Sequence, residues 1–238
     1  MSDAELHVHG TAGELSAAAG EAIVESLHNG LVGGWAAIAL AGGRTPRGVY
    51  EYIAEQHADL PWERIHVYWG DERYVPHSSP DSNYRMARET LLDLVPIPEL
   101  NVHPMPTNAP DPDDAAWAYE HLLRDASGDR PMLDAIILGI GADGHTASLF
   151  PGSPAVAERD RWVVPSQAPD EPRRRLTLTL PIINAARAVH FLVTGASKHE
   201  ALVCALAGGD CPAALVQPPD GTLTWWTDSA AISGTEGN

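Results

Sequence analysis

The chain has 238 residues, a length that suits one α/β domain with a sizeable core, so we expect a single domain over residues 1–238. Its formal net charge of −17 at pH 7 argues against nucleic acid and anionic membranes as partners. No apolar run approaches the ~18 residues of a membrane span, and the N-terminal segment lacks the features of a signal peptide. The two cysteines match no common metal motif and need no disulfide. We therefore expect a cytoplasmic protein.

Apolar periodicity predicts that strands and helices alternate along the chain. Short continuous apolar runs are typical of strands buried on both faces, whereas spacings of three and four residues indicate helices. In chain order we predict a strand over 6–8, a helix over 13–28, a strand over 35–40, a helix to about 56, a strand over 65–69, a helix over 82–94, a short strand near 102, a helix over 113–126, strands over 135–138 and 176–180, a short helix from 181, a strand over 189–193, a helix to about 206, and closing segments over 213–216 and 223–226. This order favours a mainly parallel, doubly wound α/β sheet.

A glycine turn, AGGRTP (residues 41–46), follows the strand predicted over 35–40. Thr45 has the hydroxyl of a helix N-cap, and Pro46 suits the first helical position. Such a turn is a candidate anion site, because free N–H groups and the positive end of the helix dipole face the ligand. The turn has no Walker lysine and therefore does not imply a nucleoside triphosphate. An ordinary strand–helix turn is the alternative.

Charged residues gather in WGDERYVP (residues 69–76), at the end of the strand predicted over 65–69. A charged cluster is usually a solvated loop. Its place at the carboxyl end of a strand favours a ligand site instead, because ligands of open α/β sheets bind at that edge.

The central stretch runs from Leu133 to Pro154 and begins with a buried strand over residues 135–138. The strand ends in three closely spaced glycines, which let the backbone turn tightly and leave room for a ligand. Asp143 and His145 lie in this glycine-rich turn and would point into the space that it leaves. His145 is the first candidate for a catalytic residue.

The same glycines fit G-x-G-x-x-G, the fingerprint of dinucleotide-binding proteins (residues 139–144). That site needs a full helix after the glycines and an acidic residue at the end of the next strand. Pro151 and Pro154 limit any helix here to about two turns. Asp160 precedes the next apolar run instead of following it. The pattern therefore does not favour nicotinamide binding.

Lys198 is the only lysine among the 15 lysine and arginine residues of the chain. It follows a second glycine turn, GASK (residues 195–198), which opens a helix. A single lysine in an arginine-rich chain suggests a position where a compact ammonium is needed and a guanidinium is not equivalent. Chance survival of one lysine is the alternative.

Several motifs together resemble those of the glucosamine-6-phosphate isomerase/6-phosphogluconolactonase family, on its 6-phosphogluconolactonase side. They occur in the right order over nearly the whole chain: AGGRTP, WGDERYVP, SNYR (82–85), GIGADGHTASLFP (139–151), RLTLTLP (175–181), GASK and PAALVQP (212–218). The resemblance implies a modified Rossmann-like, doubly wound, mainly parallel sheet with helices on both faces. It also implies a sugar phosphate as substrate, no cofactor and no metal, and the chain is expected to be a monomer or small homo-oligomer.

The chemistry that the resemblance implies is hydrolysis of 6-phosphoglucono-δ-lactone to 6-phosphogluconate in the pentose phosphate pathway. His145 would act as the base that deprotonates the attacking water. Asp71 is the preferred residue to orient His145, because Asp143 is too close in sequence to be presumed its partner; whether Asp71 contacts the substrate instead stays open. Backbone N–H groups of Gly141 and Gly144 would stabilise the oxyanion.

The phosphate would lie against the first glycine turn, with basic side chains adding charge. The residues expected to bind it are Gly43, Arg44, Thr45, Lys198 and Arg175, with Arg73 either joining them or contacting the sugar. The division of roles among the four cations stays open at this point.

Two other functions remain as alternatives. A deaminase or aldose–ketose isomerase of the same superfamily would carry a phenylalanine, an asparagine and a glutamate after its D-G-H, but residues 146–150 read TASLF and lack that glutamate. A non-catalytic sugar-phosphate sensor is the second alternative. No DNA-binding segment accompanies the domain, which disfavours a transcriptional sensor.

Overall fold

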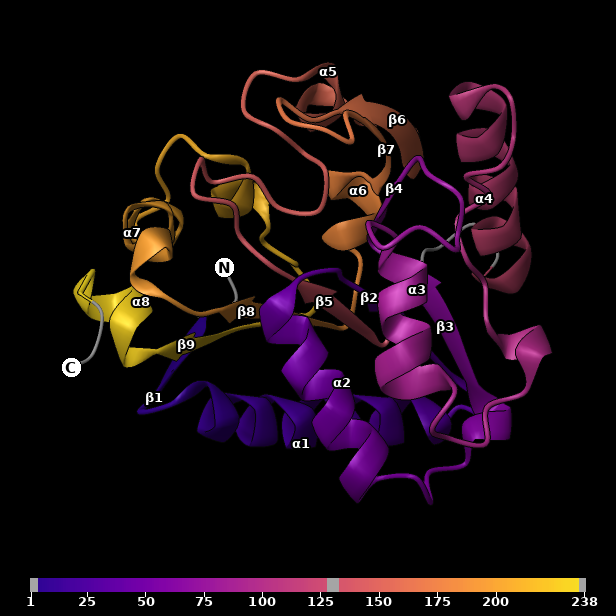
Figure 1. Ribbon diagram of the computed structural model, residues 1–238, viewed down its shortest axis with the longest axis horizontal. Coiled ribbons are helices and arrows are strands. Elements are labelled where there is room, and N and C mark those ends of the chain that lie inside the picture. The colour runs from indigo at the N-terminus through magenta and orange to yellow at the C-terminus, as the bar shows by residue number, and fades with distance from the viewer. Residues whose placement is uncertain (1–3, 128–132, 236–238) are drawn as a thin grey trace.

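The computed structural model describes residues 4–127 and 133–235, and within them the main sheet contains six strands, all paired in parallel. The order across the sheet is β1-β9-β8-β5-β2-β3 (Figure 1). Its strands are β1 (Glu5–His9), β2 (Ala36–Leu40), β3 (Ile65–Trp69), β5 (Ala135–Leu138), β8 (Ala188–Val193) and β9 (Thr222–Asp228). The predicted parallel α/β sheet is confirmed.

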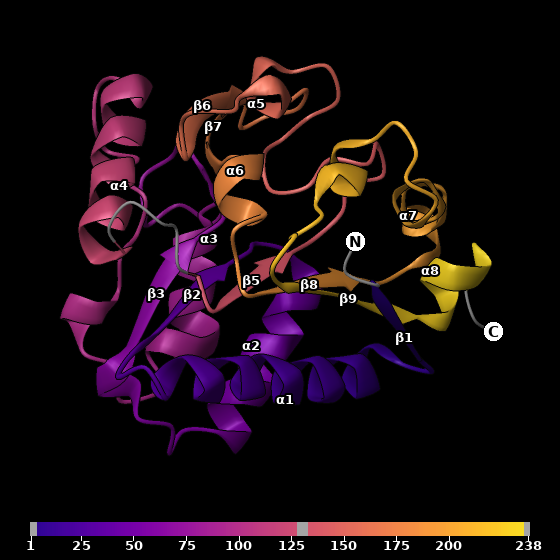
Figure 2. The ribbon, with the colours of Figure 1, turned by 180° about the vertical axis from the view of Figure 1, so that it is seen from behind.

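Helices cover both faces of this sheet, as predicted. Figures 1 and 2 show α1 and α2 on one face, with α6 and a small second sheet on the other. The helices are α1 (Ala12–Leu31), α2 (Arg44–Gln56), α3 (Asn83–Ala87) with a π-helical turn (Arg88–Leu92), α4 (Pro112–Ser127), α5 (Pro154–Ala157), α6 (Leu180–Ile183), α7 (His199–Leu206) and α8 (Ser229–Ser233). Short 3-10 helices cover Trp62–Arg64, Glu99–Asn101, Ala196–Lys198 and Pro212–Leu215.

The small second sheet is antiparallel and was not predicted. It consists of β4 (Asp71–Arg73), β7 (Arg174–Leu178) and β6 (Val163–Gln167), in the order β4-β7-β6. Gly70 connects the two sheets: its N–H donates to the carbonyl of Leu40 at 2.8 Å, and its carbonyl accepts from the N–H of Leu178 at 2.8 Å. The charged loop predicted after β3 is therefore an edge strand that turns directly into the second sheet.

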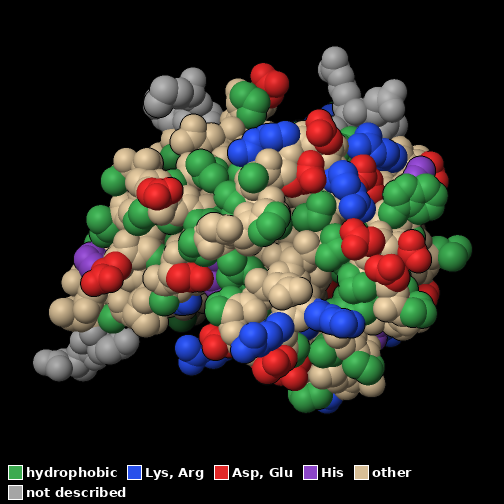
Figure 3. Space-filling model, turned by 90° about the horizontal axis from the view of Figure 1, so that it is seen from above, with side chains coloured by type: hydrophobic (Ala, Val, Ile, Leu, Met, Phe, Trp, Pro, Cys, Tyr) green, Lys and Arg blue, Asp and Glu red, His purple; other side chains and the backbone are tan. Residues whose placement is uncertain are grey.

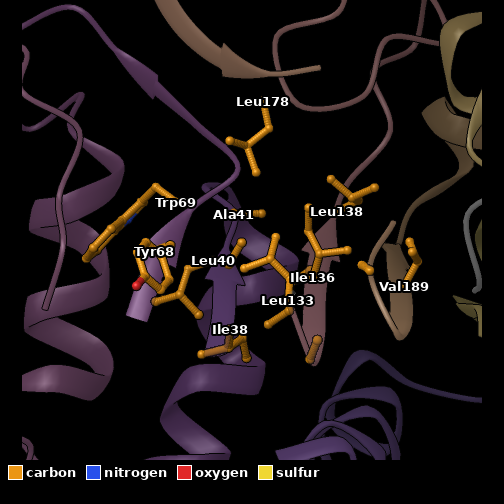
Figure 4. Close-up of a cluster of buried hydrophobic side chains, with 14 of the residues drawn as sticks. Ile38, Leu40, Ala41, Tyr68, Trp69, Leu133, Ile136, Leu138, Leu178 and Val189 are labelled. Atoms are coloured by element: carbon orange, nitrogen blue, oxygen red, sulfur yellow. The ribbon is translucent and has the colours of Figure 1, made fainter. Parts of the chain in front are cut away.

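The core is densest around β5, between β2 and β8. Every residue of β5 is buried, as the apolar run predicted. Ile136 lies beside Ala39 of β2 and Val189 of β8. Figure 4 shows Ile136 and Leu138 of β5 between Leu40 of β2 and Val189 of β8, with Leu178 above them. A strand packed on both sides fixes where its carboxyl end, and the residues that follow, lie.

Several predicted boundaries differ from the structure. The first helix starts earlier, because Thr11 and Glu14 form a capping box at its N-terminus. The segment predicted to close the fold over 213–216 belongs to a 3-10 helix. No helix lies between Gly144 and Pro154, where up to two turns were expected, so the dinucleotide pattern lacks the helix that it needs.

A buried histidine makes the stability of the fold depend on pH. Burial lowers the pKa of His190 to about 4. The Trp226 indole N–H donates to its Nδ1 at 3.3 Å. Its Nε2 lies 3.1 Å from the hydroxyl of Ser26, which itself donates to the carbonyl of Ala22. The neutral ring with its proton on Nε2 therefore donates to Ser26 and accepts from Trp226. A second proton, on Nδ1, would face the indole N–H and remove that acceptor.

We expect the free energy of unfolding to fall as the pH drops below about 6.5, because the unfolded state then binds a proton that the folded state excludes. Between pH 7 and pH 5 this residue should remove about 2 kcal/mol. Urea unfolding of the wild type and of His190→Gln at both pH values measures the effect. An equal pH dependence in the two proteins would contradict it.

Candidate active site

A cleft opens where β2, β3 and β5 end, and it has two adjoining lobes. The Lys198 lobe, of about 270 Å³, is lined by residues that include Gly42, Gly43, Asn83, Gly141 and Lys198. The Arg175 lobe, of about 450 Å³, is lined by residues that include Asp143, Ser148, Phe150, Asp170 and Arg175. Asp71, Arg73, His145 and Ala147 line both lobes. The cleft therefore combines residues from both sheets and from the central glycine turn.

His145 lies at the junction of the lobes and is held by Asp143. Its Nδ1 is 2.6 Å from Asp143 Oδ1, which also accepts from the His145 backbone N–H at 3.1 Å. The imidazole packs against Phe150 with ring centroids 4.6 Å apart. The carboxylate favours a proton on Nδ1 and so leaves Nε2 as the nitrogen that can accept one.

The electrostatics of Asp143 agree with this arrangement. Burial opposes its ionisation, but the backbone N–H, the charge and the ring of His145 together outweigh burial and lower the pKa of the Asp143 carboxyl. Asp143 therefore stays an anion beside the imidazole, where it stabilises an imidazolium formed during proton transfer.

The prediction that Asp71 orients His145 is wrong. The Ser148 hydroxyl donates to Asp71 Oδ2 at 2.6 Å, and the Asn83 amide donates to Asp71 Oδ1 at 3.4 Å. The glycine turn between residues 141 and 145 folds back on itself and brings Asp143 onto the ring instead. Asp71 lines both lobes, and its carboxylate is held by Ser148 and Asn83 instead of contacting the histidine.

The oxyanion prediction for Gly141 and Gly144 is also wrong in this conformation. The Gly141 N–H donates to the carbonyl of His145 at 2.8 Å, and the Gly144 N–H donates to the carbonyl of Gly141 at 3.0 Å. Gly144 has a φ of +82°, and a Cβ there would lie 2.5 Å from Cys211 Cβ. These glycines shape the turn that carries His145, but neither N–H is available to a ligand.

The first glycine turn starts helix α2 differently from the prediction. Gly43, with a φ of +111°, is the N-cap, and no side chain caps the helix. Thr45 lies inside the helix, and its hydroxyl is 2.7 Å from that of Thr194, so the predicted N-cap role is wrong. Gly43 lines the Lys198 lobe, whereas Arg44 and Thr45 are not among its lining residues. The uncapped N-terminus still fits an anion.

Lys198 ends the 3-10 helix over residues 196–198 and lines the lobe named after it. Burial lowers the pKa of its ammonium; the charge of Asp143 opposes this shift and that of Arg44 adds to it. The N–H of Gly195, in the turn before it, is already taken by both carboxylate oxygens of Asp228, each at 3.1 Å. The ammonium, not this glycine, is therefore what the turn offers to an anion.

Sequence reasoning missed three residues that shape the cleft. Asn83 lies behind Asp71, with its amide nitrogen 2.9 Å from the Asp71 carbonyl. Ser148 fixes the Asp71 carboxylate, and its own N–H is held by the Thr177 hydroxyl at 3.1 Å. Phe150 supports the imidazole. The only signals available were that Ser148 belongs to the polar stretch after β5 and that Asn83 belongs to the SNYR motif at the start of α3.

Residues 4–127 and 133–235 contain neither a cluster of metal-binding side chains nor a membrane-spanning helix. No group of three His, Cys, Asp or Glu side chains there is arranged to hold a metal ion. No helix in these ranges is long and apolar enough to cross a membrane.

A ligand cleft at the carboxyl ends of parallel strands, with a histidine–aspartate pair and several cations, is typical of an α/β enzyme that acts on an anionic ligand. The family model of glucosamine-6-phosphate isomerases/6-phosphogluconolactonase matches residues 10–225. The chain belongs to this family.

Relatives in the family include 6-phosphogluconolactonases from two bacteria. The protein of Synechocystis sp. is 50% identical over 206 residues, covering 83% of this chain and 84% of the relative. That of Mycobacterium tuberculosis is 41% identical over 231 residues, covering 92% and 93%. The solved structure of 6-phosphogluconolactonase from Trypanosoma cruzi matches with a TM-score of 0.90 and 33% identity, covering 98% and 97%. A monomeric glucosamine-6-phosphate deaminase, with a TM-score of 0.83 and 24% identity, shares the fold.

Proposed function

We propose that the protein hydrolyses 6-phosphoglucono-δ-lactone to 6-phosphogluconate, as a cytoplasmic enzyme of the oxidative pentose phosphate pathway. The observation that carries this proposal is the Asp143–His145 pair at the junction of two lobes that contain Lys198, Arg73 and Arg175. The whole chain would act as one domain on a small sugar phosphate, without cofactor or metal.

In this mechanism Nε2 of His145 removes a proton from a water molecule that attacks C1 of the lactone. The resulting tetrahedral oxyanion collapses, the bond from C1 to the ring oxygen breaks, and the imidazolium returns the proton to that oxygen. A lactone carbonyl is already electrophilic, so no covalent nucleophile is needed. The positioned base would contribute about 10²–10⁴-fold to the rate.

We place the substrate phosphate in the Lys198 lobe. This lobe offers the ammonium of Lys198 and the uncapped N-terminus of α2 at Gly43. Arg44 lies close enough to affect the pKa of Lys198, so it would add charge from outside the lobe. In a chain with a net charge of −17, an anionic substrate needs such a local set of cations. On the face shown in Figure 3, acidic and basic side chains lie next to one another, and no large patch of one charge covers it.

Acid release tests this function. Purified protein mixed with freshly prepared 6-phosphoglucono-δ-lactone should release acid well above the spontaneous rate. In parallel, glucosamine 6-phosphate should release no ammonia, because residues 146–148 lack the glutamate expected of a deaminase. Ammonia release would support the deaminase alternative. Binding of both sugar phosphates without turnover would support a sensor.

A further inference from the structure

Arg175 carries two guanidinium nitrogen atoms that no group among residues 4–127 and 133–235 satisfies. Its Nε and Nη1 are buried and have no hydrogen-bond partner. Buried polar atoms of native proteins are nearly always hydrogen-bonded, so such an arginine calls for an acceptor from outside the chain. Burial lowers the pKa of this guanidinium, and the charge of Arg73 adds to the effect, although Asp71, Glu72 and Asp81 oppose it. Burial of this guanidinium without a protein acceptor therefore costs free energy.

Arg73 lies directly opposite Arg175 in the small sheet. The two residues are register partners of the antiparallel strands β4 and β7, so their side chains leave the sheet on the same face. Arg73 Nη1 donates to the backbone carbonyl of Asp81 at 2.7 Å, which fixes its side chain. Like charges at paired positions destabilise a sheet, and an anion between them would remove that penalty.

The acidic side chains of the Arg175 lobe do not supply this anion. Asp71 Oδ2 accepts from Ser148, and Asp143 Oδ1 is shared between the ring and the N–H of His145. Asp170, the third acidic residue there, is exposed.

Arg175 and Lys198 lie in different lobes of the cleft. Of the two lobes, Arg175 lines only the one that contains Asp143 and Lys198 lines only the other, whereas His145 and Arg73 line both. Arg175 also borders a neighbouring pocket beside Arg174. The product of lactone hydrolysis also has two charged ends, a phosphate at C6 and a carboxylate at C1. With the phosphate beside Lys198, C1 and its new carboxylate come next to His145 and face Arg175.

We propose that Arg175, together with Arg73, forms a carboxylate-binding subsite for the acid that ring opening creates at C1. This inference rests on the proposed function. Water adds to C1, the bond to the ring oxygen breaks, and the neutral lactone becomes a carboxylate after loss of one proton. Arg175 therefore contacts a group that is charged in the product and uncharged in the substrate. It should strengthen binding of the product far more than binding of the lactone.

Calorimetric titration tests the subsite with two ligands that differ at C1. 6-Phosphogluconate carries a phosphate and a carboxylate, whereas glucose 6-phosphate carries only the phosphate. We expect Arg175→Gln to weaken 6-phosphogluconate binding about ten- to a hundredfold and to change glucose 6-phosphate binding less than about twofold. Arg175→Lys, which keeps the charge without the planar fork, should show a smaller loss with the same selectivity.

Arg174→Gln is the matched control, because it removes the same charge from the neighbouring position of β7, where the side chain is exposed. It should leave both affinities unchanged. Equal weakening of both ligands by Arg175→Gln would make this residue a phosphate ligand and overturn the proposal, as would unchanged binding of 6-phosphogluconate. If Arg175→Gln does not fold, an Arg175→Lys variant with wild-type affinity for both ligands would also overturn it. The titrations measure binding without turnover. They would therefore still test the subsite if the protein did not hydrolyse the lactone.

Discussion

Replacing His145 with alanine is expected to lower kcat for 6-phosphoglucono-δ-lactone by about 10²–10⁴ and to change KM little. The imidazole would act only in the transition state, where its Nε2 accepts the proton of the attacking water. The acidic limb of the pH–rate profile should disappear as well, because this limb would report deprotonation of the base. Initial rates of acid release, corrected for spontaneous hydrolysis, measure both effects.

His121→Ala is the control for this prediction, because His121 packs against Trp117 on α4 and is not among the residues that line the cleft. It should leave turnover unchanged. Asp143→Asn should lower kcat by a smaller factor than His145→Ala, since the ring keeps a neighbour but loses the carboxylate that favours the reactive tautomer. Near-normal turnover of His145→Ala would remove this residue from the mechanism.

Replacing Lys198 is expected to weaken use of the phosphorylated lactone by about ten- to a hundredfold in kcat/KM, mainly through KM. Loss of a charged hydrogen bond to the phosphate would cost about 1.5–3 kcal/mol. Lys198→Ala should show the full effect. Lys198→Arg should also raise KM clearly, because the planar guanidinium is bulkier than the ammonium in a lobe of only about 270 Å³. Steady-state kinetics of both variants measure the change.

Unphosphorylated gluconolactone separates the two possible roles of Lys198. Hydrolysis of this substrate, slow from the start, should be nearly the same in the wild type and in both variants. Equal losses on both substrates would show that Lys198 serves the fold or the reacting carbonyl instead of the phosphate.

Local sequence patterns were sufficient for the main sheet and for the place of the site. The apolar run of β5 and the glycines after it are local features, and each has a direct structural cause: burial on both faces, then a tight turn. The motif-based resemblance indicated the family. These features placed His145, Lys198 and Arg73 in one cleft.

The second sheet could not be read from the same patterns. β4 has only three residues, and its partner β7 begins 101 residues after β4 ends, so no local periodicity reveals the pairing. That pairing is what brings Arg175 opposite Arg73. Arg175 was predicted from its charge, but its position opposite Arg73 was not.

The errors within the site arose where side-chain direction depends on backbone conformation. A separation of two residues between Asp143 and His145 does not reveal whether their side chains meet; the turn closed by Gly141 and Gly144 decides it. Similarly, Thr45 has the chemistry of an N-cap, but the positive φ of Gly43 starts the helix two residues earlier. The backbone dihedral angles of these two glycine turns cannot be read from the order of the residues.

The hydrogen bonds of Gly70 restrict how the cleft can move. Gly70 is the single residue between β3 and β4, and it is hydrogen-bonded to Leu40 of β2 on one side and to Leu178, the last residue of β7, on the other. Rigid domains that close on a ligand need a hinge of residues free to change their dihedral angles. Because both of its backbone groups are hydrogen-bonded, Gly70 is not free to act as such a hinge between β3 and β4. We therefore expect Asp71 and Arg73 to keep their positions relative to β3 when a ligand binds, and selectivity to depend on a cleft that is shaped beforehand.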